Sequence, residues 1–138
     1  MLRRILFGGE MSNSPMTNLG LTLLRIFAGI ALMTHGIGKL PPSEQFISGV
    51  ANMGFPSIFA WASGMAEFGG GILLLLGLLT RFASLFIVFN MATALIGIHW
   101  NEPFAKQELA FLFFFIALAF LFMGANSWSV DGILRRGR

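Results

Sequence analysis

The chain has 138 residues, of which 56% are hydrophobic and only 11% charged, with a formal net charge of +3 and a mean hydropathy of +0.79. A soluble domain usually carries about 25% charged residues, so this composition points to lipid as the surrounding solvent. The absence of cysteine excludes disulfides, thiol redox chemistry and thiolate metal sites. The sequence pI near 10.7 does not indicate a nucleic-acid partner, because the few basic residues are divided between the two ends of the chain.

Four apolar segments follow one another along the chain, at about residues 19–40, 58–79, 82–100 and 108–124. A helix of roughly 20 residues crosses a hydrocarbon layer of ~30 Å, and backbone groups that face lipid must pair within their own helix. The sequence therefore predicts an all-α membrane protein, a four-transmembrane-helix bundle whose first partner is the lipid bilayer. The link "LTRF" is so short that the second and third helices must be antiparallel neighbours.

The membrane domain is expected to span residues 19–134, between a short polar N-terminal tail at residues 1–18 and a basic C-terminal end at residues 135–138. Six arginines belong to the N-terminus, the second loop and the C-terminus, whereas the other two loops carry only Lys39 and Lys106. Because basic loops stay in the cytoplasm, we expect both termini to be cytoplasmic in a multi-pass protein of the inner (plasma) membrane. Tryptophans near the span ends fit interfacial positions: Trp61, Trp100 and Trp128.

Ionisable side chains inside the spans are the first functional candidates, since each costs about 2.5–3.5 kcal/mol at a helix centre. They are Arg25, His35, Lys39, Glu67, His99 and Glu108, and Asn90 adds a neutral polar group. At 100° per residue, Arg25, His35 and Lys39 share an arc of about 80° on the first helix. Such a face is expected to point into the bundle.

Small residues accompany these charges and predict close helix packing. Gly29 and Gly36 flank the charged arc of the first helix, and Gly64 and Gly71 lie near Glu67 on the second. Glycine stripes let neighbouring backbones approach. The glycine face of the second helix could equally support a homo-oligomer.

A buried polar pair between Arg25 and Glu67 is the next prediction. Counting 1.5 Å per residue from the span centres, Arg25 lies roughly 6 Å on the cytoplasmic side of the midplane and Glu67 roughly 3 Å on the outer side. A long arginine side chain could cover that gap. In the alternative reading the pair only fixes the register of the two helices.

The same count places four further polar residues roughly 9–15 Å from the midplane, toward the outer surface: His35, Lys39, His99 and Glu108. Polar groups converging on an apolar pocket suit a ligand with a polar head and an apolar tail, and a quinone is one such ligand. The plainer alternative is that Lys39 reaches the interface while His35 bonds a carbonyl. His99 is the weakest member, because it points away from Asn90 on a regular helix.

No covalently bound cofactor is expected. Two histidines on different helices could in principle ligate a haem b, but this is disfavoured because Lys39 would crowd the site with positive charge. A metal site built from His35, His99 and Glu108 is equally disfavoured, since nothing in the sequence fixes the spacing between the helices.

The segments "LLRIFAGIALMTHGIGKL" and "AEFGGGILLLLGLLTRFA" together resemble the DoxX family of small four-helix membrane proteins. The likeness continues through "NMATALIGIH", the Glu–Leu of "KQELAFLF" and "SWSVDGIL", and covers roughly residues 19–134. The family's polar positions correspond to Arg25, His35, Lys39, Glu67, Arg81, Glu108 and Asp131.

The resemblance implies a link to redox chemistry, since the family is related to subunits of an archaeal thiosulfate:quinone oxidoreductase, and other members are linked to membrane-associated redox or detoxification complexes. We therefore expect the membrane subunit of an oxidoreductase system, which binds a quinone-like or other small amphiphile and receives electrons from a soluble or membrane redox partner. Whether the chain is itself an enzyme stays open. The alternatives are a non-catalytic membrane anchor or scaffold for such a complex and, third, an oligomeric small-molecule transporter.

Overall fold

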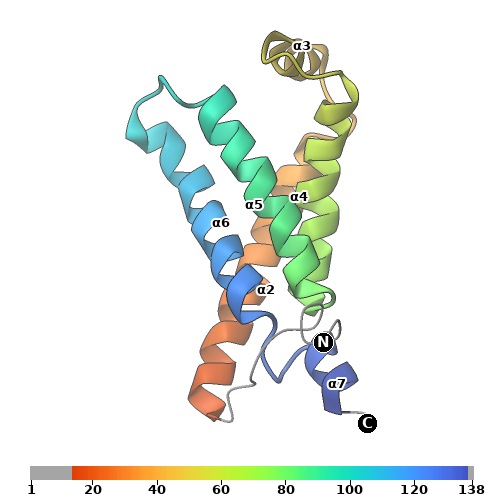
Figure 1. The fold of residues 1–138 in the computed structure, drawn as a ribbon, viewed down its shortest axis with the longest axis vertical. Coiled ribbons are helices and arrows are strands. Elements are labelled where there is room, and N and C mark those ends of the chain that lie inside the picture. The colour runs from red at the N-terminus through yellow and green to blue at the C-terminus, as the bar shows by residue number, and fades with distance from the viewer. Residues whose placement is uncertain (1–13, 137–138) are drawn as a thin grey trace.

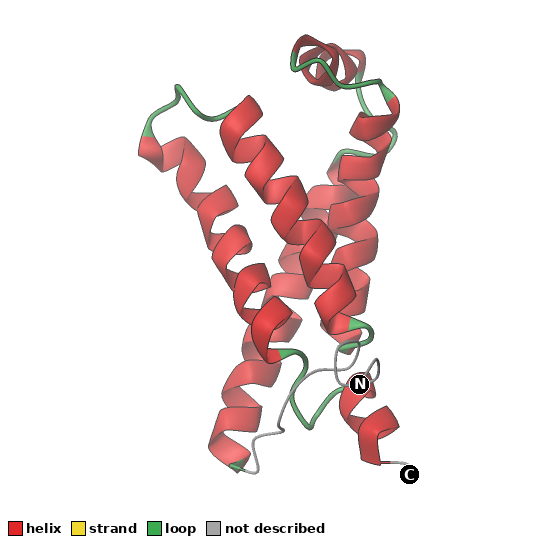
Figure 2. Ribbon diagram, in the orientation of Figure 1, coloured by secondary structure: helices red, strands yellow, loops and turns green. Residues whose placement is uncertain are grey.

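The computed structural model describes residues 14–136, which form six helices and no strand (Figures 1 and 2). In chain order the helices are α2 (Pro15–Gly38), α3 (Glu44–Asn52), α4 (Ile58–Leu76), α5 (Thr80–Gly97), α6 (Phe104–Met123) and α7 (Val130–Arg136). Four of them, α2, α4, α5 and α6, are long and apolar enough to cross a membrane. The predicted all-α bundle with four spans is therefore confirmed, whereas α3 and α7 were not predicted as helices.

The spans differ from their predicted limits at the ends. α2 begins at Pro15, within the predicted polar tail of residues 1–18, because proline is well suited to a first helical turn. Residues 1–13 of that tail lie outside the described part of the chain, as do residues 137 and 138 of the predicted basic end. α4 ends at Leu76 because Gly77 adopts a left-handed φ of 66°, and the short turn makes α4 and α5 antiparallel neighbours as predicted.

Each of the four spans packs against the next span along the chain. α2 packs against α4, α4 against α5 and α5 against α6, and α5 and α6 lean away from α4 toward the end that carries α3 (Figure 1). Side chains from all four spans fill the core: Ala28, Leu32, Leu74, Ile87, Met91, Phe113, Ala117 and Phe120. α2 begins at the end where α7 lies, hereafter the α7 end, and the opposite end is the α3 end.

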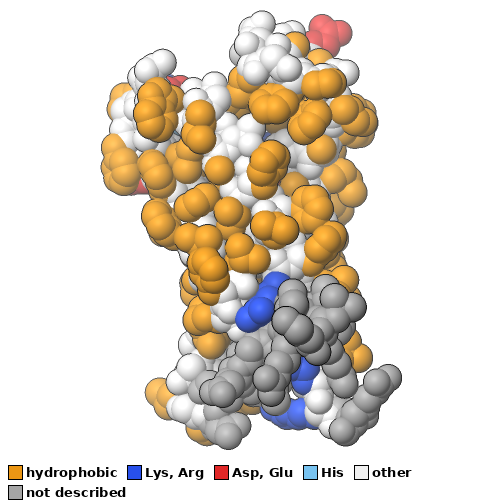
Figure 3. All heavy atoms as spheres, viewed as in Figure 1, with side chains coloured by type: hydrophobic (Ala, Val, Ile, Leu, Met, Phe, Trp, Pro, Cys, Tyr) orange, Lys and Arg blue, Asp and Glu red, His pale blue; other side chains and the backbone are white. Residues whose placement is uncertain are grey.

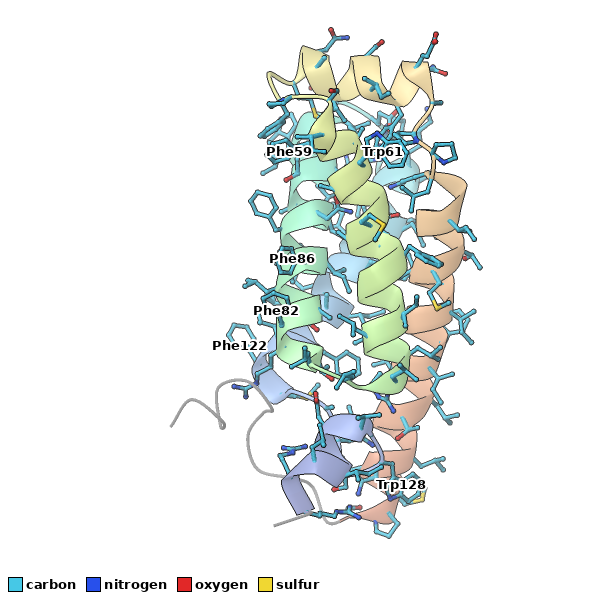
Figure 4. All side chains as sticks on the ribbon, turned by 90° about the vertical axis from the view of Figure 1, so that its right-hand side faces the viewer. Phe59, Trp61, Phe82, Phe86, Phe122 and Trp128 are labelled. Carbon is cyan, nitrogen blue, oxygen red and sulfur yellow. The ribbon has the colours of Figure 1, made fainter. Side chains whose placement is uncertain are left out.

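Large apolar side chains cover the outside of the spans (Figure 3). Phe27 is 72% exposed and Phe89 62%, in the middle of α2 and α5. In water such a surface would be costly, but in lipid it is the expected exterior. Trp61 lies toward the α3 end and Trp128 toward the α7 end (Figure 4), as interfacial aromatics do.

Glycines bring α2 and α4 into backbone contact. A Cβ atom on Gly29 would lie 2.8 Å from the carbonyl oxygen of Gly71, and one on Gly71 would lie 2.8 Å from that of Gly29. A Cβ on Gly36 would lie 2.3 Å from the backbone nitrogen of Phe68. Gly64 makes room in the same way for the side chain of Leu40. The four glycines expected at helix contacts thus all lie in the α2–α4 interface.

Arg25 and Asp131 hold the α7 end together. Arg25 donates to the carbonyl oxygens of Leu74 and Leu75 at the end of α4 and, at 3.0 Å, to that of Trp128. The fully buried Asp131 accepts from the backbone N–H groups of Leu79, at 2.8 Å, and of Thr80, at 2.9 Å. These bonds satisfy the free groups at the end of α4 and the start of α5.

Replacing Asp131 by alanine is expected to lower the free energy of unfolding by about 2–3 kcal/mol, because two charge-assisted bonds to backbone donors disappear. Asp131→Asn keeps one acceptor oxygen and should cost clearly less. Unfolding of the purified variants in detergent, followed by circular dichroism, measures both losses. Equal stability of Asp131→Ala and the parent chain would contradict this account.

Gly36→Ala should lower the free energy of unfolding by about 1–3 kcal/mol, because the new methyl group meets the backbone of α4 rather than a movable side chain. Gly20→Ala is the matched control on the same helix, because nothing lies within 4 Å of its Cβ position. That change should be neutral or stabilising by up to about 1 kcal/mol. Thermal unfolding midpoints shifting in the same direction for both variants would refute the distinction.

Candidate functional site

A buried carboxylate in the middle of α4 joins α5 to the residue that follows α2. Glu67 of α4 is 1% exposed, and its Oε1 accepts from Lys39 Nζ at 2.6 Å and from Asn90 Nδ2 at 2.9 Å. Lys39 follows directly after α2, and Asn90 lies in the middle of α5. The second oxygen, Oε2, is buried and makes no hydrogen bond within residues 14–136. The Lys39–Glu67–Asn90 cluster therefore combines an ion pair with an acceptor that has no protein donor.

The predicted Arg25–Glu67 pair is wrong. Arg25 and Glu67 are both buried, as expected, but Arg25 bonds the carbonyl oxygens at the end of α4 instead. The glycine contacts show why: Gly36 lies opposite Phe68, so Glu67 faces a level of α2 about 11 residues beyond Arg25. At 1.5 Å per residue this separation is roughly 16 Å, which no arginine side chain covers.

A cavity of about 200 Å³ lies beside the cluster, between α3, α4 and α5. Its wall is mostly apolar, with Phe46 and Val50 from α3, Phe59 and Ala66 from α4, and Phe89 from α5 among its lining residues. The polar residues that line it are Lys39, Ser63, Asn90 and Thr93. Two of these four, Lys39 and Asn90, belong to the cluster and both bond Glu67, so the cavity borders the cluster on its polar side.

Lys39 connects the cavity to the buried carboxylate. Its side chain is 35% exposed, and its Nζ lies 5.7 Å from the centre of the Phe46 ring. An ammonium group has three N–H donors, and one of them serves Glu67. The others can serve an acceptor atom of a bound molecule, so the cavity offers a hydrogen-bond donor at one side and aromatic rings elsewhere.

The structure does not bring together the four residues predicted to form an outward-facing mouth. His35 is exposed, and its ring makes an edge-to-face contact with that of Phe113 of α6, with 5.9 Å between the ring centres. Lys39 turns to Glu67, and Glu108 lies exposed beside phenylalanines of α6. No hydrogen bond or ion pair in the described chain joins any two of His35, Lys39, His99 and Glu108. Only Lys39 lines the cavity.

His99 belongs instead to a small cluster in the link between α5 and α6. Its Nδ1 lies 2.5 Å from Glu102 Oε2, and Lys106 approaches the other carboxylate oxygen at 3.4 Å. The hydrogen bond to His99 is the main cause that lowers the pKa of Glu102, and Lys106 adds to it. Gln107 donates to the carbonyl oxygens of His99 and Glu102, so these side chains close the loop rather than face the cavity.

Two features of the site escaped the sequence prediction. Asn90 was noted only as a neutral polar residue, and its bond to Glu67 could not be foreseen because the rotation of α5 was unknown. α3, which forms one wall of the cavity, carries a readable start signal: Ser43 accepts from the backbone N–H of Phe46 and Glu44 follows it. Apolar residues at 46, 47 and 50 give this stretch one apolar face.

Among residues 14–136, no three His, Cys, Asp or Glu side chains come together as a metal site. The ion pair and its neighbouring cavity are therefore the best candidate site in the described chain. The geometry suits binding of a molecule with an acceptor group on an apolar or aromatic body.

Three relatives are similar over most of their length. A Bacillus subtilis protein named "Putative oxidoreductase CatD" is 26% identical over 121 residues, 87% of this chain and 90% of the relative. An uncharacterized protein of Haemophilus influenzae is 33% identical over 80% of this chain and 87% of its own. Inner membrane protein YqjF of Escherichia coli is 29% identical over 86% of this chain and 95% of its own. No solved structure matches the chain.

The model of the DoxX family matches residues 20–100, more than half of the chain. This segment contains most of α2 and all of α3, α4 and α5, with the whole Lys39–Glu67–Asn90 cluster and every residue that lines the cavity. The match confirms the resemblance found in the sequence motifs. The protein is a multi-pass membrane protein with four spans, and it belongs to the DoxX family.

Proposed function

We propose that this chain is the membrane subunit of an oxidoreductase system of the inner membrane and that it binds the ring of a quinone-like amphiphile in the cavity between α3, α4 and α5. The observation that carries the proposal is the joint position of Lys39, a donor held by Glu67, and an apolar cavity of about 200 Å³. A relative named as an oxidoreductase supports the reaction class, and one named as an inner membrane protein supports the location.

The chemistry of such a ligand fits the wall of the cavity. A quinone carbonyl accepts a hydrogen bond, which Lys39 Nζ can donate, and its ring can pack against Phe46 or Phe59. The volume suits one substituted ring rather than a complete amphiphile, so the tail would lie outside. Electrons would come from a partner protein, and this chain would hold and orient the carrier.

A non-catalytic anchor is the second candidate, and one observation favours it. Within the described residues, the side chains of Arg25 and Asp131 make their hydrogen bonds with backbone groups of neighbouring segments. Polar groups used in this way hold helices together and need no ligand. The two candidates differ at the cavity, which a pure anchor would not need.

Ala66→Phe fills the cavity from α4 and should reduce the quinone that co-purifies with the protein by at least about tenfold, equivalent to 1.4 kcal/mol of binding energy. Met65→Phe is the matched control, because Met65 is exposed on α4 and does not line the cavity. Lipid extracts of equal amounts of each purified variant are compared by mass spectrometry. Equal quinone in both variants, or none in the parent chain, would sink the proposal and leave the anchor standing.

Lys39→Met alone is expected to cost about 3 kcal/mol of stability, because it leaves a buried carboxylate without its cation. The double variant Lys39→Met with Glu67→Gln removes both charges and should recover most of that loss. It should nevertheless hold little quinone, since the donor at the cavity is gone. Unfolding midpoints and quinone content are measured on the same samples, and a stable double variant with full quinone content would speak for a purely structural pair.

A further inference from the structure

α3 lies at the end of the bundle, turned across the direction of the spans (Figures 1 and 4). Phe46, Val50 and the following Met53 line the cavity, whereas Glu44 and Ser48 are exposed on the opposite side of the helix. Val50 is only 4% exposed. The helix thus presents an apolar face to the cavity and a polar face outward, as a helix at a membrane surface does.

Contacts at both ends of α3 hold it in place. At its C-terminal end, Met53 occupies the space left by the missing side chain of Gly97, where a Cβ atom would lie 2.1 Å from the sulfur. Near its N-terminal end, the Phe46 ring lies under Lys39 Nζ at 5.7 Å, and Lys39 is itself held by Glu67. α3 therefore connects the end of α5 to the ion pair and forms the wall of the cavity on that side.

The side of the cavity between α4 and α5 is different. Phe59, Phe86 and Phe89 line the cavity and are also 41%, 49% and 62% exposed. Phe59 and Phe86 lie along the same edge of the molecule in Figure 4, on the surface of the spans. Side chains that line a cavity and also face lipid mark an opening toward the lipid. Phe86 and Phe89 lie within the span α5, so the opening lies at membrane depth.

We infer that ligands enter the cavity sideways from the bilayer, between α4 and α5, and that α3 is a fixed roof that keeps water out. The inference rests on the proposed function for the identity of the ligand, but the route follows from the wall of the cavity alone. It restricts the ligand class to molecules dissolved in the membrane, with a ring that reaches Lys39 and a tail that stays among Phe86 and Phe89.

Thiol labelling tests the route without any ligand, because the chain contains no cysteine. Three single variants are compared in freeze–thawed vesicles, so that reagents reach both faces: Ala66→Cys in the cavity, Ser48→Cys on the outer face of α3 and Met65→Cys on the lipid face. One reagent is a maleimide with a long alkyl chain that enters the bilayer. The other is a sulfonated maleimide that stays in water.

With the alkyl reagent, Ala66→Cys should be labelled at the same rate as Met65→Cys. With the sulfonated reagent, Ala66→Cys should be labelled roughly 100-fold more slowly than Ser48→Cys, because a charged group is excluded from hydrocarbon. Equal labelling rates of Ala66→Cys and Ser48→Cys by the sulfonated reagent would overturn the inference, since water would then reach the cavity. Failure of the alkyl reagent at Ala66→Cys, with Met65→Cys labelled, would also overturn it.

A disulfide between residues 53 and 97 tests whether α3 has to move. Met53 Cγ lies 3.3 Å from a Cβ built on residue 97, close to the ~3 Å between a disulfide sulfur and the partner Cβ. In the Met53→Cys, Gly97→Cys variant, exchange of bound quinone for isotope-labelled quinone in the bilayer should be equally fast with the disulfide formed or reduced. Exchange that stops on oxidation, with Met53→Cys alone unaffected, would show entry under α3.

The quinone content of the parent chain and the thiol labelling of Ala66→Cys test the proposed function and the entry route separately. If the parent chain holds no quinone, the proposed function fails, while the labelling of Ala66→Cys still decides the route. If quinone is held but the sulfonated reagent reaches Ala66→Cys freely, the function stands and the sideways entry is refuted.

Discussion

The backbone contact between α2 and α4 is the interaction on which the rest of the structure depends. Gly29 and Gly71 approach each other's carbonyl oxygens, and Gly36 meets the backbone of Phe68. Such close approach fixes the register of two antiparallel helices to within one residue, because any slip would place a side chain where there is no room. The register then decides which polar groups meet: Arg25 reaches the end of α4, and Lys39 reaches Glu67.

Much of the fold could be predicted because the membrane leaves few choices. Apolar length predicted the four spans, and the short stretch "LTRF" between two of them predicted the antiparallel pair. The helix ends were less accurate, since they depend on local signals such as Pro15 and Gly77. α3 was missed because nine half-polar residues cannot cross a bilayer and therefore gave no signal in a search for spans.

The site was harder to predict, for two physical reasons. Depth counted from span centres carries an error of several residues at each end, and a helix rises about 1.5 Å per residue. These errors paired Glu67 with Arg25, whereas the structure pairs Glu67 with Lys39. Rotation about the helix axis was also unknown for α5 and α6. Asn90 of α5 could therefore not be assigned to Glu67, nor could Glu108 of α6 be shown to lie outside the cavity.

The two ends of the bundle satisfy their charges in different ways, and this difference argues for a division of roles. At the α7 end, the Arg25 side chain bonds carbonyl oxygens and the Asp131 side chain bonds backbone N–H groups within residues 14–136, so these charges complete helix ends. In the half of the bundle toward α3, Lys39 and Glu67 bond each other beside a cavity, and Glu67 Oε2 has no donor within the described part of the chain. A charge that completes a helix end cannot be spared for a ligand without loosening the fold, whereas a pair beside a cavity can exchange or add a partner. The chemistry of this protein is therefore to be sought at Lys39 and Glu67, while the α7 end provides the rigid base that keeps them in place.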